Sequence, residues 1–272
     1  MIPKIVHYCW FGRGKMPELV LRCIASWHKY MPDWEYRLWT EDSLAEALKK
    51  PYKDGLSEGS NSPSFRKGER VGMEDYWLEY MPAYVKEAYA AKKYAFVSDY
   101  VRLWALEREG GLYMDVDFEV YKPFDDLMER HEAFAGYEGS KRNPVMMGVM
   151  AATLHHPWIQ RMMQTYENRV FVKADNSYDM TPNTEYFLKW MQERGFVADG
   201  QEKDCMGVHI LPVEYFCPVL TTGENLHCEH TYCEHKGLHS WSGDGGWKEK
   251  VLRILGEKWK IKLIKLKRKV LG

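Results

Sequence analysis

Several features that would assign a compartment or a class are missing from this chain of 272 residues. No run approaches the ~18 consecutive apolar residues that a membrane-spanning helix requires. The first residues lack a basic stretch followed by a long apolar run, so a signal peptide is not predicted. The six cysteines are scattered and do not form the spacing of a disulfide framework, which favours a reducing compartment. These absences predict a cytoplasmic protein.

Internal repeats are also missing, and 45% of the residues are hydrophobic, so the chain can bury a sizeable core as one large domain. Its net charge of −1 hides an asymmetry between two regions. The last 25 residues, 248–272, contain ten Lys or Arg against two Glu, a net charge of +8, and the preceding 247 residues therefore carry −9. The sequence predicts a folded body over residues 1–247 and a separate basic tail over 248–272.

The N-terminal pattern predicts a strand, a helix and a second strand at residues 3–11, 18–30 and 35–39. This order and spacing indicate a βαβ unit and a largely parallel sheet. In such sheets ligands bind outside the carboxyl ends of the strands, where Trp10 is expected. From the sequence alone, Trp10 is equally well explained as an aromatic residue of the core.

The centre of the chain, residues 85–121, predicts a helix, a glycine break and a strand. Large apolar residues recur every four positions from Phe96 to Trp104, which indicates a mostly buried helix. Gly110 and Gly111 predict its end, because glycine takes the left-handed conformation without a Cβ penalty. From residue 112 to 120 the apolar residues alternate, which predicts a strand with one polar face.

Four charged residues stand out in this segment. Asp99 and Arg102 are three apart on the helix and are therefore neighbours in space. Asp115 and Asp117 point to the same side of a continuous strand, roughly 7 Å apart. Two carboxylates at one place raise each other's pKa unless a cation joins them, and a hard divalent ion with oxygen ligands would do so. For one ion to bind both directly, the strand must bend or end near Asp115.

Each of these signals also has an ordinary structural explanation. An Asp-x-Asp pair can simply face solvent on a strand, and Asp99 with Arg102 can be a helix ion pair.

The polar, Gly- and Ser-rich residues 53–75 lack periodicity and predict an inserted or flexible loop. Further along, we expect a strand at 133–137, a buried strand or loop at 144–152, short strands or an extended connection at 208–212 and 215–218, and helices at 157–169 and 183–194.

Residues 227–239 contain four His, two Cys and two Glu. Taken alone this composition suggests zinc, but the C-x4-C spacing with interleaved histidines matches no common structural zinc site. A zinc site here stays open as an alternative.

Taken together, SDYVR and REGGLYMDVDFEV resemble the sugar-nucleotide glycosyltransferases with a DXD motif, in particular glycosyltransferase family 32 of the capsular-polysaccharide and mannosyltransferase type. The N-terminal PKIVHYCWFG and the segment His235-x4-Ser240-Trp241 share this resemblance, whereas residues 53–75 depart from the family pattern. The resemblance implies an α/β fold of the GT-A type, with a mixed, mostly parallel sheet flanked by helices. It also implies transfer of a sugar from a UDP- or GDP-sugar to a saccharide or lipid-linked acceptor in surface polysaccharide synthesis, with retention of configuration.

The resemblance further implies roles for particular residues. Two adjacent histidines are common in the family where this chain has His235-Lys236, and alignment on Ser240-Trp241 gives the ligand position to His235, with His239 as the alternative. The implied sets are catalytic roles for Asp99, Arg102 and Asp117; donor binding by Trp10, Asp99, Arg102, Asp115, Ser240 and Trp241; and Mn²⁺ or Mg²⁺ binding by Asp115, Asp117 and His235.

The basic tail mixes Leu, Ile and Trp with lysines at near-helical spacing, which predicts reversible binding to an anionic membrane surface at the cytoplasmic face. The alternative is a C-terminal helix packed on the body. Nucleic acid is not an expected partner, because the rest of the chain is acidic. Two rival functions remain from the sequence: a peripheral membrane or zinc-binding adaptor, and a metal-dependent phosphohydrolase.

Overall fold

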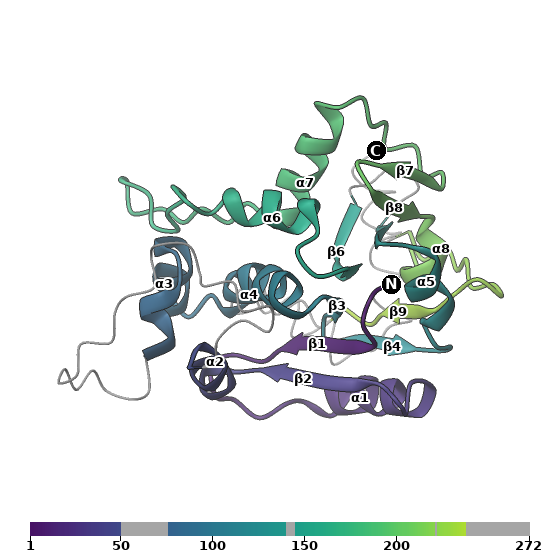
Figure 1. Ribbon diagram of the computed structural model, residues 1–272, viewed down its shortest axis with the longest axis horizontal. Coiled ribbons are helices and arrows are strands. Elements are labelled where there is room, and N and C mark those ends of the chain that lie inside the picture. The colour runs from purple at the N-terminus through teal and green to yellow at the C-terminus, as the bar shows by residue number, and fades with distance from the viewer. Residues whose placement is uncertain (50–75, 140–144, 221, 238–272) are drawn as a thin grey trace, which may run out of the picture.

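The computed structural model describes residues 1–49, 76–139, 145–220 and 222–237 (Figure 1). The expected insertion at 53–75 and the basic tail at 248–272 lie outside these residues. The division of the chain into a body and a tail therefore stays a prediction.

A seven-stranded mixed sheet forms the centre of the fold, in the order β2-β1-β3-β6-β5-β8-β7. β1 pairs in parallel with β2 and β3, and β5 pairs in parallel with β8, whereas β6 and β7 are antiparallel to their neighbours. Five of the seven strands thus run in one direction. Their bounds are β1 Ile5–Cys9, β2 Glu35–Trp39, β3 Gly111–Met114, β5 Ala133–Tyr137, β6 Val145–Ala152, β7 Lys203–Cys205 and β8 Val208–Leu211.

Helices flank this sheet, and a second sheet of two strands lies beside it on the right of Figure 1. Helix α4 packs on β1 and β3, α7 on β6, and α1 on the small sheet. The helices are α1 Glu18–Tyr30, α2 Glu41–Leu48, α3 Ala83–Ala90, α4 Tyr94–Glu109, α5 Asp125–Arg130, α6 Pro157–Gln164, α7 Asn183–Gln192 and α8 Val213–Phe216, with a 3₁₀ turn η1 at Tyr76–Tyr80 and the small sheet formed by β4 Phe118–Val120 and β9 Cys233–His235. A mixed, mostly parallel sheet flanked by helices is what the sequence predicts for a GT-A fold, and these features are confirmed.

The first βαβ unit has the expected bounds at α1 and β2. In α1 the buried residues Val20, Cys23 and Trp27 recur every three or four positions, which places them on one face of the helix. The indole Nε1 of Trp27 donates a hydrogen bond of 2.7 Å to the carbonyl oxygen of Phe118. Helix α1 therefore supports the start of β4, the strand that follows the Asp-x-Asp motif.

The single helix expected before Gly110 is in fact two helices, α3 and α4. Between them Lys92 takes a φ of 57°, and the amide of Lys93 donates to the carbonyl oxygen of Ala88 at 2.9 Å. The backbone turns here without a Gly or Pro, so the sequence carries no local signal for the break. The end of α4 is as predicted: Gly111 has a φ of 112°, and a Cβ there would lie 2.7 Å from the carbonyl oxygen of Ile5.

The prediction of one continuous strand over residues 112–120 is wrong. β3 ends at Met114 and β4 begins at Phe118, with a turn between them. Tyr113, expected on the polar face, is buried, because β3 lies inside the sheet between β1 and β6 with α4 packed on it.

Two other expected elements differ near the C-terminal half. The short strand or extended connection expected at 215–218 overlaps the end of helix α8, which starts after Pro212 and ends at Phe216, so only residues 217–218 are free of helix. Helix α6 ends at Gln164 rather than Arg169, because the amides that follow it donate to carbonyl oxygens three residues earlier, and not four as in an α-helix. Among the described residues, no helix has the length and apolar character needed to cross a membrane.

Candidate active site

The Asp-x-Asp motif lies in the turn between β3 and β4. The amide of Asp115 donates to the carbonyl oxygen of Gly148 on β6 at 2.7 Å, and the amide of Phe118 donates back to Asp115 at 3.2 Å. β3 therefore ends before Asp115, and β4 begins after Asp117. This interruption of the strand is the condition under which both carboxylates can approach one ion. Gly148 has a steric role here, because a Cβ at this position would lie 2.8 Å from Oδ2 of Asp115.

Helix α4 delivers Arg102 to this turn. Its Nη2 lies 2.9 Å from Oδ1 of Asp99 and 3.3 Å from Oδ1 of Asp115. Its Nε donates to the carbonyl oxygen of Ser98 at 3.3 Å, and its Nη1 donates to that of Met147. The expected Asp99–Arg102 pair is thus present, and it extends to the first aspartate of the motif.

Burial makes the ionisation of this group interdependent. The Tyr113 hydroxyl donates to Oδ1 of Asp115 at 2.7 Å, and the Arg102 guanidinium lies 4.6 Å from the centre of the Tyr113 ring. Burial raises the pKa of Asp115, Arg102 opposes this, and the nearby Asp117 raises it further. Burial likewise raises the pKa of Asp99. Burial alone would lower the pKa of Arg102, but the surrounding acidic groups, Asp115 foremost, raise it above its usual value.

The small sheet brings His235 to Asp117. β4 and β9 are antiparallel, with Phe118 opposite His235. Nε2 of His235 lies 3.1 Å from Oδ2 of Asp117, and its ring stacks on Phe118 with a centroid distance of 4.7 Å and an interplanar angle of 14°. Burial would lower the pKa of His235, but the contact with Asp117 and the nearby acidic groups outweigh it and raise the pKa.

The predicted metal ligands therefore lie around one turn. Within the described part of the chain, no three acidic, His or Cys side chains are already arranged as a set that could hold an ion. Asp117 and His235 contact each other, and Oδ1 of Asp115 is occupied by Arg102 and Tyr113. Two carboxylates and one imidazole are a donor set that suits Mn²⁺, and the carboxylates alone suit Mg²⁺. The chemistry of the residues fits a divalent cation once the Asp117–His235 contact opens.

Glu138 is a member of the site that sequence reasoning missed. It follows β5, whose carboxyl end lies at the same edge of the sheet as those of β1 and β3. It is half-buried, burial raises its pKa, and it interacts electrostatically with His235, Asp115 and Arg102. The available signal was its position directly after a buried strand, in a sheet whose strand ends bind ligands.

Asn183, the first residue of α7, was also missed. It is 1% exposed, its Nδ2 donates to the backbone carbonyl oxygen of Asp99 at 2.6 Å, and its Oδ1 accepts a hydrogen bond from the Tyr166 hydroxyl. A buried amide with both ends satisfied fixes its neighbours. Asn183 therefore ties α7 to the part of α4 that carries Asp99.

The remaining predicted residues are placed in part. Trp10 directly follows β1 at the same edge of the sheet, and its indole Nε1 donates to the carbonyl oxygen of Gly14 at 2.6 Å. Ser240, Trp241 and the alternative ligand His239 lie outside the described residues. Their roles in binding the donor and the metal stay predictions.

Comparisons with known proteins agree with the geometry. The family described as "Glycosyltransferase sugar-binding region containing DXD motif" matches residues 17–134, which include Asp99, Arg102 and both aspartates of the motif. Inositol phosphoceramide mannosyltransferase 1 of Schizosaccharomyces pombe is 23% identical over 180 residues, covering 63% of this chain and 46% of that protein. Inositol phosphoceramide mannosyltransferase 3 of the same organism is 24% identical over 170 residues, covering 62% of this chain and 38% of that protein.

The chain thus spans less than half the length of these two curated relatives. Among solved structures, the PaToxG glycosyltransferase is 20% identical with a TM-score of 0.44, covering 71% of this chain and 70% of that one. Residues 17–134 of this chain thus resemble the sugar-binding region of DXD-containing glycosyltransferases, and this matched region carries Asp99, Arg102, Asp115 and Asp117 of the candidate site.

Proposed function

We propose that the protein is a metal-dependent, retaining glycosyltransferase that moves a sugar from a UDP- or GDP-sugar to a saccharide or lipid-linked acceptor in surface polysaccharide synthesis. The observation that carries the proposal is the convergence of Asp115, Asp117 and His235 at the β3–β4 turn, with Arg102 beside them. Retention of configuration rests on the resemblance to family 32 alone.

The residues have distinct tasks in this proposal. Arg102 offers a planar fork of donors for phosphate or sugar hydroxyl groups, and the Asp99 carboxylate accepts hydrogen bonds from sugar hydroxyls. Asp115, Asp117 and His235 would hold Mn²⁺ or Mg²⁺. When bound, the ion would supply positive charge that offsets the negative charge developing on the diphosphate leaving group.

Burial supports the strength of these contacts. Arg102 is 6% exposed and Asp117 7% exposed. Charges in a buried site of low dielectric constant act more strongly on a ligand than charges at the surface. The ion pair of Asp99 and Arg102 also keeps both groups oriented before the donor arrives.

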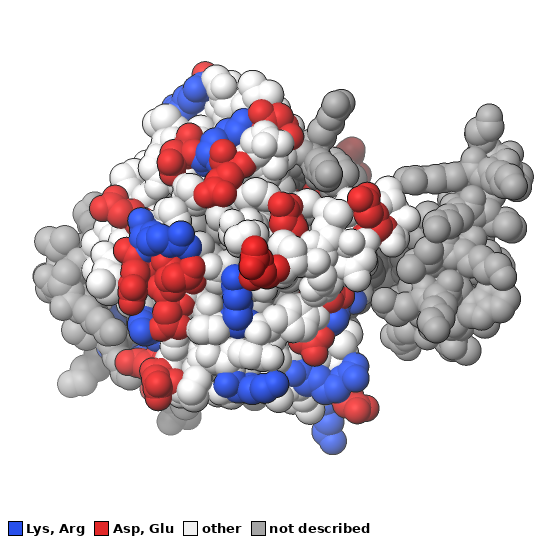
Figure 2. Space-filling model, turned by 90° about the vertical axis from the view of Figure 1, so that its right-hand side faces the viewer, with Lys and Arg blue, Asp and Glu red and all other residues white. Residues whose placement is uncertain are grey.

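The acceptor class is supported by the relatives. Two of them are named as inositol phosphoceramide mannosyltransferases, so that a lipid-linked acceptor is the variant we favour. A lipid-linked acceptor requires the enzyme to reach a membrane surface. The face shown in Figure 2 carries acidic and basic side chains side by side. We assign attachment to the basic tail, residues 248–272, because its net charge of +8 would attract it to the anionic cytoplasmic face of the membrane.

Calorimetric titration with UDP- and GDP-sugars, with and without Mn²⁺, tests the proposal. We expect one nucleotide class to bind only when Mn²⁺ is present. Zinc retained through purification without affinity for any sugar nucleotide would contradict it and favour the adaptor. Hydrolysis of simple phosphate esters without sugar transfer would favour the phosphohydrolase.

A further inference from the structure

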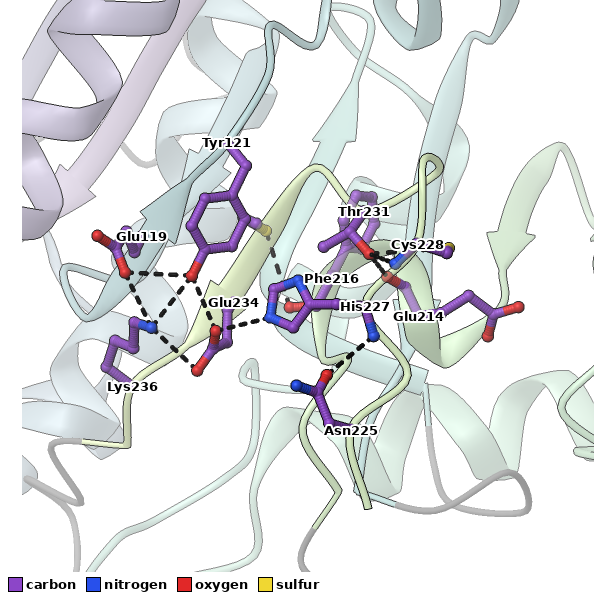
Figure 3. A network of polar contacts seen from close by, with 11 residues as sticks. Glu119, Tyr121, Glu214, Phe216, Asn225, His227, Cys228, Thr231, Glu234 and Lys236 are labelled. Carbon is purple, nitrogen blue, oxygen red and sulfur yellow. Dashed lines mark hydrogen bonds and ion pairs between the residues drawn. The ribbon is translucent and has the colours of Figure 1, made fainter. Parts of the chain in front are cut away.

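His235 lies on the two-stranded sheet formed by β4 and β9. Its sequence neighbours Glu234 and Lys236 belong to a network of polar and charged side chains (Figure 3). In this sheet Glu119 on β4 lies directly opposite Glu234 on β9. Like charges opposite each other destabilise an antiparallel pair. By itself, this pair of glutamates would push β9 away from β4.

Lys236 resolves that conflict. Its Nζ lies 2.8 Å from Oε2 of Glu119 and 3.0 Å from Oε1 of Glu234, and it donates to the Tyr121 hydroxyl at 3.1 Å. An ammonium group has three N–H donors, and here each has one acceptor. The Tyr121 hydroxyl donates onward to Oε2 of Glu234 at 2.8 Å, and Nε2 of His227 lies 2.9 Å from the same oxygen. We call these five residues the β4–β9 clamp.

The clamp acts directly on the position of His235. Glu234 and Lys236 are its two neighbours in sequence, and side chains alternate across a strand. Fixing these two side chains on one side therefore fixes the direction of the imidazole on the other. The backbone amide of Lys236 also donates to the carbonyl oxygen of Asp117 at 2.8 Å, which ties β9 to the motif itself.

We propose that Lys236 is a positioning residue, which keeps β9 paired with β4, and with it the His235 imidazole on the side of Asp117, by joining Glu119, Glu234 and Tyr121 in the β4–β9 clamp. This inference rests on the proposed metal-dependent function, in which His235 is a ligand. Lys236 itself touches neither the donor nor the ion in this proposal. β9 has only three residues, so its backbone pairing alone fixes its position weakly. The ammonium group of Lys236 strengthens this pairing because it neutralises the two opposed glutamates.

Lys236→Met tests the inference, because it keeps the length of the side chain and removes its charge. Lys122→Met is the matched control: Lys122 lies over the Tyr232 ring at 3.9 Å and donates to the Glu229 carbonyl oxygen, outside the clamp. Mn²⁺ affinity is measured by electron paramagnetic resonance, without turnover. We expect Lys236→Met to weaken Mn²⁺ binding about 10-fold, the lower end for residues that orient a metal ligand, and Lys122→Met to leave it unchanged.

A double-mutant cycle with His235→Ala separates positioning from a general loss of stability. If Lys236 acts through His235, Lys236→Met causes no further loss of Mn²⁺ affinity once His235 is alanine. An equal loss in both backgrounds overturns the inference. Tyr121→Phe is a milder second variant that leaves the charges in place, and it should weaken Mn²⁺ binding to a smaller extent. An unchanged affinity in both Lys236→Met and Tyr121→Phe also overturns the inference.

The ligand-free protein gives a readout that does not depend on the metal. We expect the imidazole NMR signals of His235 to shift or broaden in Lys236→Met and to stay in place in Lys122→Met. If His235→Ala leaves Mn²⁺ affinity unchanged, the ligand role of His235 in the proposed function fails, and these signals alone decide whether Lys236 positions it. Unmoved signals in Lys236→Met contradict the positioning role.

Discussion

Asp117 and His235 lie 118 positions apart in the chain, and the distance between Oδ2 of the first and Nε2 of the second is 3.1 Å. The pairing of β4 with β9 creates this proximity, since it sets His235 opposite Phe118, the residue after Asp117. The two-stranded sheet therefore brings these two residues together, and the proposed metal site depends on the pairing of a strand of three residues.

Replacing Asp117 by Asn should abolish metal-dependent transfer, with a loss of at least about 100-fold, since a neutral amide cannot supply a charged ligand to a divalent ion. Asp117 is 7% exposed, so it does not fit the alternative in which the motif simply faces solvent on a strand. Its contact with His235 adds stability, so the free energy of unfolding should fall by about 1 kcal/mol. Transfer assays with Mn²⁺ and urea unfolding measure the two effects.

The control for this variant is Asp42→Asn, which changes an exposed carboxylate paired only weakly with Arg13 at the surface. It should leave both activity and stability unchanged. Transfer by Asp117→Asn at close to the normal rate would rule out its role as a metal ligand.

Asp99→Asn should lower the rate of transfer by orders of magnitude while the fold persists. Arg102 keeps its contacts with Asp115 and with the Met147 carbonyl oxygen in this variant, so the guanidinium stays in place. The changed group is then the acceptor for sugar hydroxyls. Full activity of Asp99→Asn in a transfer assay would reduce the Asp99–Arg102 pair to a structural ion pair.

Arg102→Met should lower activity and stability together. A surface helix pair contributes only a few tenths of a kcal/mol, but Arg102 is buried between two carboxylates. Removing one partner of a buried ion pair costs about 3–5 kcal/mol, because the remaining charge loses its compensation. Urea unfolding of Arg102→Met beside the exposed control Arg13→Met measures this difference, and a cost below 1 kcal/mol for Arg102→Met would contradict the burial argument.

Stability should fall in mild acid partly because of His156, the N-cap of α6. Its Nδ1 accepts a hydrogen bond from the amide of Trp158, and burial lowers its pKa below 6.5. As the pH falls through about 6.5, the usual pKa of histidine, the unfolded chain binds a proton that the folded His156 resists, so the folded state loses stability. The loss continues until the pH reaches the lowered pKa of the folded state.

His156→Asn should reduce this pH dependence, because asparagine can cap the helix and does not titrate. Melting temperatures at pH 7.5 and pH 5.5 give the measurement, with His230→Asn as a control at an exposed histidine. An identical drop in the melting temperature of wild type and His156→Asn would show that other groups cause the acid sensitivity.

Deleting residues 258–272 should release the protein from anionic vesicles without loss of turnover of a soluble acceptor analogue. The deletion removes seven Lys or Arg, each of which is attracted to an anionic surface by about 1 kcal/mol. Sedimentation with vesicles at low and high salt measures the effect, and salt should weaken binding of the intact protein by screening. A sharp drop in the melting temperature on truncation, with no vesicle binding by the intact protein, would instead make the tail part of the fold.

Local pattern was sufficient wherever a segment is stabilised by its own periodicity. The sequence predicted α1 and β2 with the bounds found in the structure, and it predicted that Asp99 and Arg102 would be neighbours, because a helix places residues three apart side by side. The glycine pair after α4 was equally predictable, since only glycine accepts its backbone angles at no cost. The DXD motif, with its spacing from α4, was enough to indicate the resemblance to DXD-containing glycosyltransferases that the match over residues 17–134 supports.

Tertiary contacts decided the rest. The turn between Asp115 and Asp117 exists because β3 pairs within the large sheet while β4 pairs with β9, and alternation in the sequence cannot show a change of partner. The proximity of Glu138 to the site follows from the order of the strands, and the contacts of Lys236 follow from two glutamates that oppose each other only when β4 and β9 dock. These are contacts between distant parts of the chain, and they stabilise the fold only after the strands that carry them have paired.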